Sequence, residues 1–381
     1  MPAHGLQLRG PHAPAFAAPN DSERRLLGLL LRSGSISQAD VTRVMDLTQP
    51  TVSRIVTGLL AKGMLEAGAR PPAGRGQPSA LLSLKPDYAY ALGISLVGGM
   101  LAMDLVDFSG TLLWRDAAAF EDMSPEAVGA TLSRFKARAI ADADIDPTRL
   151  FAAGVGVSGF FVGEGPLMNT PALLDDWALI DIAPVLAKVL DLPVLVDNDG
   201  NAAAIGEALR GAGLRYANLA YFQITNGFGG GLVIDGRPFR GAHGNAGEFA
   251  VLWQALGLEH PNLERLRTLL VEHGAPRGSL ADMLANLDLD HPGTEAWLAE
   301  ATTAYSLAAA AASAVIDCQA IILGGEIPPA LAARLAERMS IAGTQRRGRP
   351  KPQPAILPSE APGDAVSLGA AFLALQTTFF D

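Results

Sequence analysis

The spacing of apolar residues changes near Tyr88 and divides the chain into two parts. Before Tyr88, apolar residues recur at helical spacing in short segments. After it, strand-like runs alternate with helical segments, which is the pattern of an α/β protein. The 381 residues are enough for two or three domains at roughly 100–200 residues each. We therefore expect a small helical domain followed by a large α/β domain built from two related halves.

The charge of the chain divides at almost the same place. Residues 1–85 contain ten Lys and Arg against five Asp and Glu, a net charge of +5. The remaining 296 residues contain 19 basic and 34 acidic side chains, a net charge of −15. A basic segment joined to an acidic one indicates that the small part binds a polyanion.

Several classes of protein are excluded by composition. The single cysteine, Cys318, excludes an intramolecular disulfide framework and a zinc site built on several thiolates. No apolar run approaches the ~20 residues of a membrane helix, so we expect no membrane partner. Residues 1–20 lack the basic region followed by an apolar region that a signal peptide requires. We expect residues 1–19 to form a disordered leader and the protein to be cytoplasmic.

Three short helices followed by two strands are predicted for residues 20–85, the outline of a winged helix-turn-helix. The strands, at residues 64–66 and 80–84, flank a basic tip from Arg70 to Gln77 that would form the wing. The residues that signal the starts and ends of the helices are Asn20 with Glu23, Gly34, Ser37 with Asp40, Thr48 with Pro50, and Gly63.

The third helix has one apolar face and one polar face. Polar side chains on such a helix contact base edges and phosphates, and a wing arginine contacts the backbone or the minor groove. A three-helix bundle with a merely solvated polar face has the same periodicity, but the charge of +5 and the wing favour DNA binding. The residues predicted to bind DNA are Gln49, Thr51, Ser53, Arg54 and Arg75.

Four segments of the acidic part have residues suited to ligand binding. The glycine run 225–231 forms either an anion-binding nest or a plain hairpin. Residues 196–201 follow a strand, where α/β sheets place ligands, and Asp199 there either binds a hydroxyl group or caps a helix. Residues 241–248 end at Glu248, and the pair 324–325 follows another strand. The basic run 346–351 is interpreted as a solvated loop, with a second DNA contact as the alternative.

Together these segments resemble the ROK family (repressors, open reading frames and kinases), a branch of the actin-like ATPase fold. The resemblance extends from about Asn20 to the C-terminus. It implies an N-terminal winged helix-turn-helix over residues 20–85 and a sugar-kinase-like sensor domain of two α/β lobes over residues 86–381. The motifs that carry it are Thr51–Arg54, Gly76–Pro78, Gly154–Gly159 (GVGVSG), Asn169–Trp177 (NTPALLDDW), Asn198–Asn201 (NDGN), Asp235–Gly247 (DGRPFRGAHGNAG) and Leu323–Gly325 (LGG).

The resemblance also separates a kinase from a regulator. Kinases of the family have an Asp-x-Gly-Gly-Thr loop for phosphates and metal, but Ser95 occupies the aspartate position and no threonine follows. A hydroxyl cannot replace a carboxylate in organising Mg²⁺ around a triphosphate. Asp199 matches the catalytic base of the family, but by itself it can still bind a sugar hydroxyl, so its presence does not restore the kinase interpretation. We therefore expect no catalytic residue, no bound ATP and no enzyme activity.

The resemblance implies that the residues for sugar binding are present and that those for zinc binding are replaced. By resemblance, the residues that contact sugar hydroxyls are Asn198, Asp199, Glu248 and Glu264. The one histidine and three cysteines that bind structural zinc in many members are replaced by Val251, Ala255, Gly257 and Asn262. We expect no metal there, because nearby His260 alone does not make a zinc site.

Three functional hypotheses follow. The first is a transcriptional regulator, a repressor of carbohydrate genes, that binds an operator in double-stranded DNA as a homodimer or a dimer of dimers and senses a sugar or sugar derivative. The second is an active ATP-dependent sugar kinase with an appended DNA-binding domain. The third is a regulator that binds DNA constitutively and has lost its ligand.

Overall fold

The N-terminal domain is a winged helix-turn-helix, as predicted. The structure, a computed structural model, describes residues 8–10, 16–68, 80–120, 122–343 and 345–380. The elements of the domain are α1 (Asp21–Ser33), β1 (Ser35–Ser37), α2 (Gln38–Met45), α3 (Gln49–Ala61), β2 (Leu65–Gly68) and β3 (Leu81–Leu84). Asn20 and Glu23 form the predicted capping box, but Thr48 caps α3 without a side-chain hydrogen bond. The short polar strand β1, which sequence did not predict, pairs with β3.

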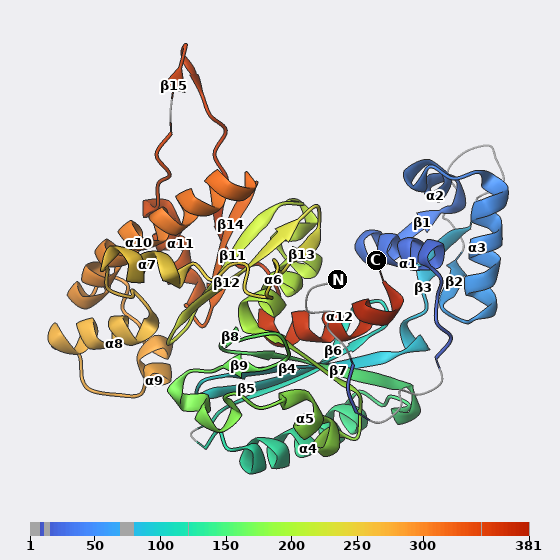
Figure 1. The fold of residues 1–381 in the computed structure, drawn as a ribbon, viewed down its shortest axis with the longest axis horizontal. Coiled ribbons are helices and arrows are strands. Elements are labelled where there is room, and N and C mark those ends of the chain that lie inside the picture. The colour runs from blue at the N-terminus through green and yellow to red at the C-terminus, as the bar shows by residue number, and fades with distance from the viewer. Residues whose placement is uncertain (1–7, 11–15, 69–79, 121, 344, 381) are drawn as a thin grey trace.

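The first lobe is built on a five-stranded sheet with the order β10-β7-β4-β5-β6. The predicted antiparallel meander is confirmed, and β7 and β10 add to it in parallel. Helices α4 (Pro125–Asp142) and α5 (Ile182–Leu190) cover one face (Figure 1). The strands of this sheet are β4 (Tyr90–Val97), β5 (Met100–Asp107), β6 (Leu112–Ala119), β7 (Leu150–Val157) and β10 (Val194–Asn198).

The second lobe has a sheet with the order β13-β12-β11-β14-β17. Its longest helix, α10, has 25 residues, but within the described ranges no helix has the length and apolarity needed to cross a membrane. The strands are β11 (Leu219–Ile224), β12 (Phe228–Ile234), β13 (Arg237–Phe239), β14 (Ala320–Gly325) and β17 (Ala355–Pro358). The helices of this lobe are α7 (Ala250–Leu256), α8 (Leu263–Glu272), α9 (Leu280–Ala285), α10 (Pro292–Ile316) and α11 (Pro329–Arg338).

Two further helices, α6 (Asp199–Arg210) and α12 (Ala365–Phe379), lie between the sheets and pack against each other (Figure 1). Helix α12 contacts the first sheet, and α6 contacts the second. The crossing depends on glycine, because a Cβ on Gly369 would lie 1.8 Å from the carbonyl oxygen of Ala202. One on Gly206 would lie 2.4 Å from that of Ala365. At these two glycines the helices therefore meet backbone to backbone.

The winged helix shares a hydrophobic core with the first lobe, in which Leu26 and Leu30 of α1 join Phe379 and Phe380 at the end of α12. Arg24 of α1 reinforces this junction by donating hydrogen bonds to four backbone carbonyls at the same end, those of Gln376, Thr377, Thr378 and Phe380, at 2.8–3.2 Å. The DNA-binding domain is thus joined directly to the helix that lies between the lobes.

The prediction of a disordered leader is wrong for the described residues 8–10 and 16–19. The backbone of Arg9 pairs with that of Val194 at the edge of the first sheet. The ring of Phe16 packs edge to face on Tyr88, Phe151 and Phe379 at 5.4–6.0 Å between ring centroids. Residues 1–7 and 11–15 lie outside the described part of the chain.

Candidate functional site

Four of the five predicted DNA-binding residues lie on α3, away from its buried face. That face packs in the core through Val52, Ile55, Val56 and Leu59. Gln49, Ser53 and Arg54 are exposed, and Thr51 is half-buried. Arg75 lies outside the described residues. The contacts of these five residues with DNA remain predictions.

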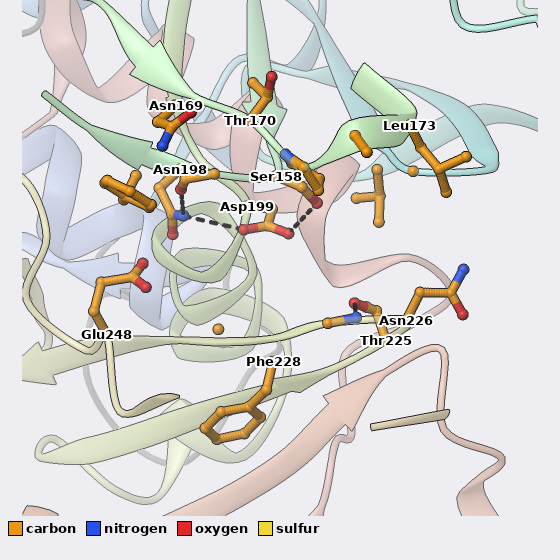
Figure 2. Close-up of a pocket in the computed structure, with 18 residues that line it drawn as sticks. Ser158, Asn169, Thr170, Leu173, Asn198, Asp199, Thr225, Asn226, Phe228 and Glu248 are labelled. Carbon is orange, nitrogen blue, oxygen red and sulfur yellow. Dashed lines mark hydrogen bonds between the residues drawn. The ribbon is translucent and has the colours of Figure 1, made fainter. Parts of the chain in front are cut away.

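A cavity of about 470 Å³ opens beside the end of β10 and the β11–β12 turn, and both lobes line it (Figure 2). Three of the four residues predicted to bind sugar, Asn198, Asp199 and Glu248, line it together. Apolar contacts come from Val97, Phe160, Leu173 and Phe228. The polar side chains around it are Ser158, Asn169, Thr170, Asn198, Asp199, Thr225, Asn226 and Glu248.

Asn198 and Asp199 are held at the start of α6. Asn198 is the N-cap, and its Oδ1 accepts a hydrogen bond from the backbone N–H of Asn201 at 3.0 Å. Capping by Asn198 places Asp199 in the first turn of the helix, so Asp199 itself is not the cap. The carboxylate of Asp199 accepts hydrogen bonds from the Ser158 hydroxyl at 2.7 Å and the Gly200 N–H at 2.9 Å. Figure 2 shows this carboxylate between Asn198 and Ser158. It is therefore fixed in position before any ligand arrives.

A buried ion pair orients the loop that carries Glu248. Asp197, which is fully buried, pairs with Arg240. Burial raises the pKa of Asp197, and the guanidinium of Arg240 opposes that rise. The amide of Asn201 donates to the carbonyl of Gly244 at 3.0 Å. These contacts tie residues 240–244 to the end of β10, so Arg240 acts as a positioning residue.

Three carboxylic acids near the cavity have raised pKa values, with burial as the main cause. Burial raises the pKa of Asp199 to about 6, against its hydrogen bonds from Ser158 and Gly200. The pKa of Glu248 rises to about 7 through burial and repulsion by Asp199. The pKa of Glu326, which follows β14, also rises to about 7 through burial and repulsion by Asp364 and Asp199. The region therefore favours protonated or hydrogen-bonded carboxyl groups over free anions.

The raised pKa of Glu248 predicts how stability depends on pH. Its pKa is about 7 in the folded protein against 4.5 for an exposed glutamate, so the folded state binds the proton more tightly. The contribution of protonated Glu248 to the free energy of unfolding is fully present below about pH 4.5 and is lost as pH rises through 7. We expect Glu248→Gln to raise the free energy of unfolding at pH 8 by about 2–3 kcal/mol and to change it little at pH 4.5.

Urea unfolding at pH 4.5 and pH 8 measures this difference, and Glu164→Gln, which removes an exposed carboxylate, is the control. Equal effects of Glu248→Gln at the two pH values would contradict the prediction.

Glu264 is the fourth residue predicted to bind sugar, and the structure does not bring it to the cavity. It lies in the first turn of α8, and its carboxylate pairs with Nε of Arg267 at 2.9 Å. An arginine one turn along the helix pairs with the carboxylate, and Glu264 is not among the residues that line the cavity. Its contact with sugar stays a prediction.

The glycine run 225–231 is a hairpin, one of the two structures left open by the sequence. Strands β11 and β12 pair with Ile224 opposite Phe228. A Cβ on Gly200 would lie 2.4 Å from the carbonyl oxygen of Gly230. The glycines therefore let the first turn of α6 approach β12 closely, which places Asp199 beside this hairpin.

The structure also places the positions where the resemblance puts a kinase loop and zinc ligands. Ser95 is buried inside β4 and does not line the cavity, although Val97 and Gly98 do.

Val251, one of the four expected zinc positions, is 59% exposed. Trp253 of the same helix is fully buried and packs on Phe228, Tyr305 and His260. An aromatic cluster thus anchors α7 at this place. Among the described residues, no group of three or more His, Cys, Asp or Glu could hold a metal ion.

Sequence reasoning missed Ser158, Asn169 and Thr170 as cavity residues. The signal was present, because all three lie in the family motifs GVGVSG and NTPALLDDW. No motif indicates Glu326, because it follows the LGG motif. Only the fold brings it close to Asp199.

This arrangement defines a class of protein: a winged helix-turn-helix joined to a two-lobed sugar-kinase fold whose cleft is lined with polar and apolar side chains. Residues 91–250 match the model of the ROK family, and residues 19–76 match that of the MarR family. The chain therefore carries a ROK family domain behind a MarR-type winged helix.

Individual proteins resemble the chain to different extents. The protein y4fQ of Sinorhizobium fredii is 28% identical over 364 residues, 94% of this chain and 92% of its own length. The xylose repressor of Caldicellulosiruptor bescii is 28% identical over 226 residues, 58% of this chain. The match spans only 56% of that repressor. The crystal structure of a ROK family transcriptional regulator, a homolog of E. coli MLC protein, superimposes with a TM-score of 0.65. The superposition covers 93% of this chain and 96% of that regulator. The sequence identity is 21%, so the similarity shows the fold alone.

Proposed function

We propose that the protein is a transcriptional repressor that binds operator DNA through its winged helix and responds to a sugar bound in the cleft. The observation that carries the proposal is the cavity with Asn198, Asp199 and Glu248 at the start of α6, the helix that packs on α12 and so reaches the DNA-binding domain. The similarity to xylose repressors supports a carbohydrate as the effector. A sugar that favours one arrangement of the lobes would change operator affinity through this path.

The effector that fits this cleft is an uncharged, unphosphorylated sugar. Among the described residues that line the cavity, none is Lys, Arg or His, whereas Asp199 and Glu248 are acidic. Phosphate recognition in proteins normally uses cationic side chains or helix N-termini, and here the first turn of α6 presents a carboxylate. Neutral hydroxyl groups, by contrast, can be bound by the amide, hydroxyl and carboxylate groups present.

The same charges argue against an active sugar kinase, the second candidate. The side chain at the expected aspartate position, Ser95, is buried in β4, and Asp199, Glu326 and Asp364 repel one another at the place where the lobes meet. A triphosphate would add further negative charge, and the described lining residues include no cation to neutralise it. We propose that the protein uses neither ATP nor zinc, and that it acts as a homodimer on a palindromic operator.

Mobility shift of the DNA upstream of the protein's own gene, with and without sugars, tests the function. We expect full-length protein to retain a specific fragment and a neutral sugar to release it, whereas the corresponding sugar phosphate has no effect. Arg54→Ala should weaken the complex by about tenfold, as the loss of one base or phosphate contact does. Arg43→Ala, an exposed arginine of α2, is the control. Failure to retain any fragment specifically would overturn the proposal.

A further inference from the structure

The basic run that we interpreted as a solvated loop is an ordered hairpin. Strands β15 (Gln345–Arg346) and β16 (Arg349–Pro350) pair with Arg346 opposite Arg349. Figure 1 shows this hairpin standing out from the second lobe, well away from α3. Its turn consists of Arg347 and Gly348, both with positive φ, at 53° and 71°. We propose that the tip of this hairpin, Arg347 to Lys351, binds the minor groove of A/T-rich DNA outside the part of the operator that α3 contacts.

The charge of the hairpin is unlike that of the domain around it. Residues 346–351 contain four of the 19 basic side chains that follow residue 85, and residues 338–359 contain no acidic side chain. Arg347, Arg349 and Lys351 are exposed. Because charges are screened over about 8 Å at physiological salt, a tip that projects from an acidic domain keeps its positive potential. This tip is suited to a polyanion.

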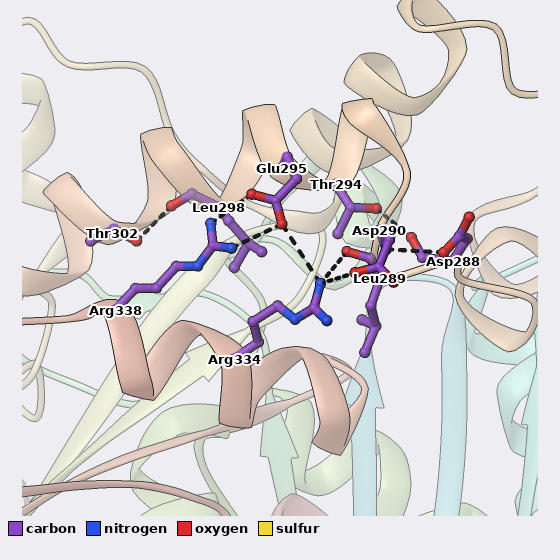
Figure 3. Close-up of polar contacts among 9 residues, drawn as sticks. All are labelled: Asp288, Leu289, Asp290, Thr294, Glu295, Leu298, Thr302, Arg334 and Arg338. Atoms are coloured by element: carbon purple, nitrogen blue, oxygen red, sulfur yellow. Dashed lines mark hydrogen bonds and ion pairs between the residues drawn. The ribbon is translucent and has the colours of Figure 1, made fainter.

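Arginines just before the hairpin behave differently, as Figure 3 shows. Arg338 of α11 makes two hydrogen bonds of 2.9 Å to the carboxylate of Glu295. Arg334 donates to the carbonyl of Leu289 at 2.6 Å and to Asp290 at 2.7 Å. These contacts fix α11 to the start of α10 and give the hairpin a firm base. Arg347 and Arg349, by contrast, make no ion pair with any described residue.

The turn has an unusual residue for its backbone. A two-residue hairpin turn with positive φ at both positions favours Asn-Gly or Asp-Gly, and the left-handed conformation is uncommon for a side chain such as arginine. Among the described residues, Arg347 has no ion-pair partner that offsets this cost.

The shape of the tip matches a narrow groove. Gly348 has no side chain, and no atom lies within 4 Å of where its Cβ would be, so the turn can approach a surface closely. Pro350, Pro352 and Pro354 stiffen the returning arm and reduce the entropy lost on binding. The minor groove of A/T tracts is narrow and strongly negative, and inserted arginines are attracted to it. The geometry therefore favours this groove over a flat acidic protein surface.

Fluorescence anisotropy with full-length protein and duplexes of about 20 base pairs, two helical turns, tests the proposal. One duplex is an A/T tract and the other is G/C only. We expect the protein to prefer the A/T duplex, and Arg347→Gln/Arg349→Gln to bind it about tenfold more weakly. The slope of log K against log[salt] should fall by about 2, from the loss of two cationic contacts.

Two further variants separate groove binding from general charge. Arg347→Lys/Arg349→Lys keeps the charge, so we expect the salt slope to remain and the preference for A/T to fall. Arg134→Gln/Arg277→Gln removes two exposed arginines elsewhere in the chain. We expect this variant to keep both the salt slope and the preference for A/T.

Equal A/T binding by the wild type and Arg347→Gln/Arg349→Gln, or an equal loss in the Arg134→Gln/Arg277→Gln control, would overturn the inference. Specific RNA or protein binding through the tip, with no change on A/T DNA, would also overturn it. The inference rests on the proposed function in that the protein must meet DNA. The Arg54→Ala variant on operator DNA tests that function separately, so failure of one is distinguishable from failure of the other.

Discussion

Replacing Asp199 by asparagine is expected to weaken sugar binding about 100-fold while leaving operator binding intact. The carboxylate lines the cavity and is buried. A hydrogen bond to a charged group contributes about 1.5–3 kcal/mol, and every tenfold change in affinity corresponds to about 1.4 kcal/mol. Asparagine keeps the size of the side chain and an oxygen that can accept the bond from Ser158. The fold of α6 should therefore persist.

Titration calorimetry measures the loss of affinity, and mobility shift should show that Asp199→Asn stays on DNA at sugar concentrations that release the wild type. Asp176→Asn is the matched control, because Asp176 is exposed and does not line the cavity. If Asp199→Asn bound sugar with the wild-type affinity, this cleft would not be the sugar-binding site.

The second large effect is expected from Arg24→Met. Arg24 donates to four carbonyls at the end of α12, at 2.8–3.2 Å, where a positive charge also complements the helix dipole. Methionine fills similar space but leaves those carbonyls without a charged donor. We expect the free energy of unfolding to fall by about 3 kcal/mol. Operator binding should persist but respond much less to sugar.

Urea unfolding and mobility shift with and without sugar measure the two effects of Arg24→Met. Arg25→Met changes the neighbouring exposed arginine of the same helix and should match the wild type in both measurements. An unchanged sugar response in Arg24→Met would show that the signal passes through the apolar junction rather than through this residue.

The two variants test the ends of one physical path. Asp199 stands in the first turn of α6, Gly206 and Gly369 bring α6 and α12 into backbone contact, and Arg24 joins α12 to the winged helix. Coupling between the sites requires that sugar prefer one of two arrangements of these elements.

Local signals predicted the elements well. The capping box at Asn20 and the apolar stripe of α3 were correct because both depend on residues within a few turns of each other. The cluster of Asn198, Asp199 and Glu248 was also predicted, but through family motifs rather than through geometry. Their common cavity depends on β10 and the loop after β13 meeting across about fifty residues of sequence.

The remaining features depend on tertiary contacts that the sequence pattern does not encode. Glu264 fits its motif, yet Arg267 takes its carboxylate. Phe16 sits in a segment of low periodicity and is ordered only because Tyr88, Phe151 and Phe379 surround it. Arg240 and Glu326 acquire their roles from partners far along the chain. The hairpin at residues 345–350 was hidden by a composition that usually indicates a solvated loop.

The absence of cations among the described lining residues of the cleft also bears on which event the proposed regulator would report to a cell. The unphosphorylated effector that we propose would be present after import and would disappear when a kinase commits it to metabolism. Repression would then lift when uptake exceeds consumption, and it would return as phosphorylation catches up. The protein would therefore measure the imbalance between supply and use of its sugar, rather than the flux through the pathway.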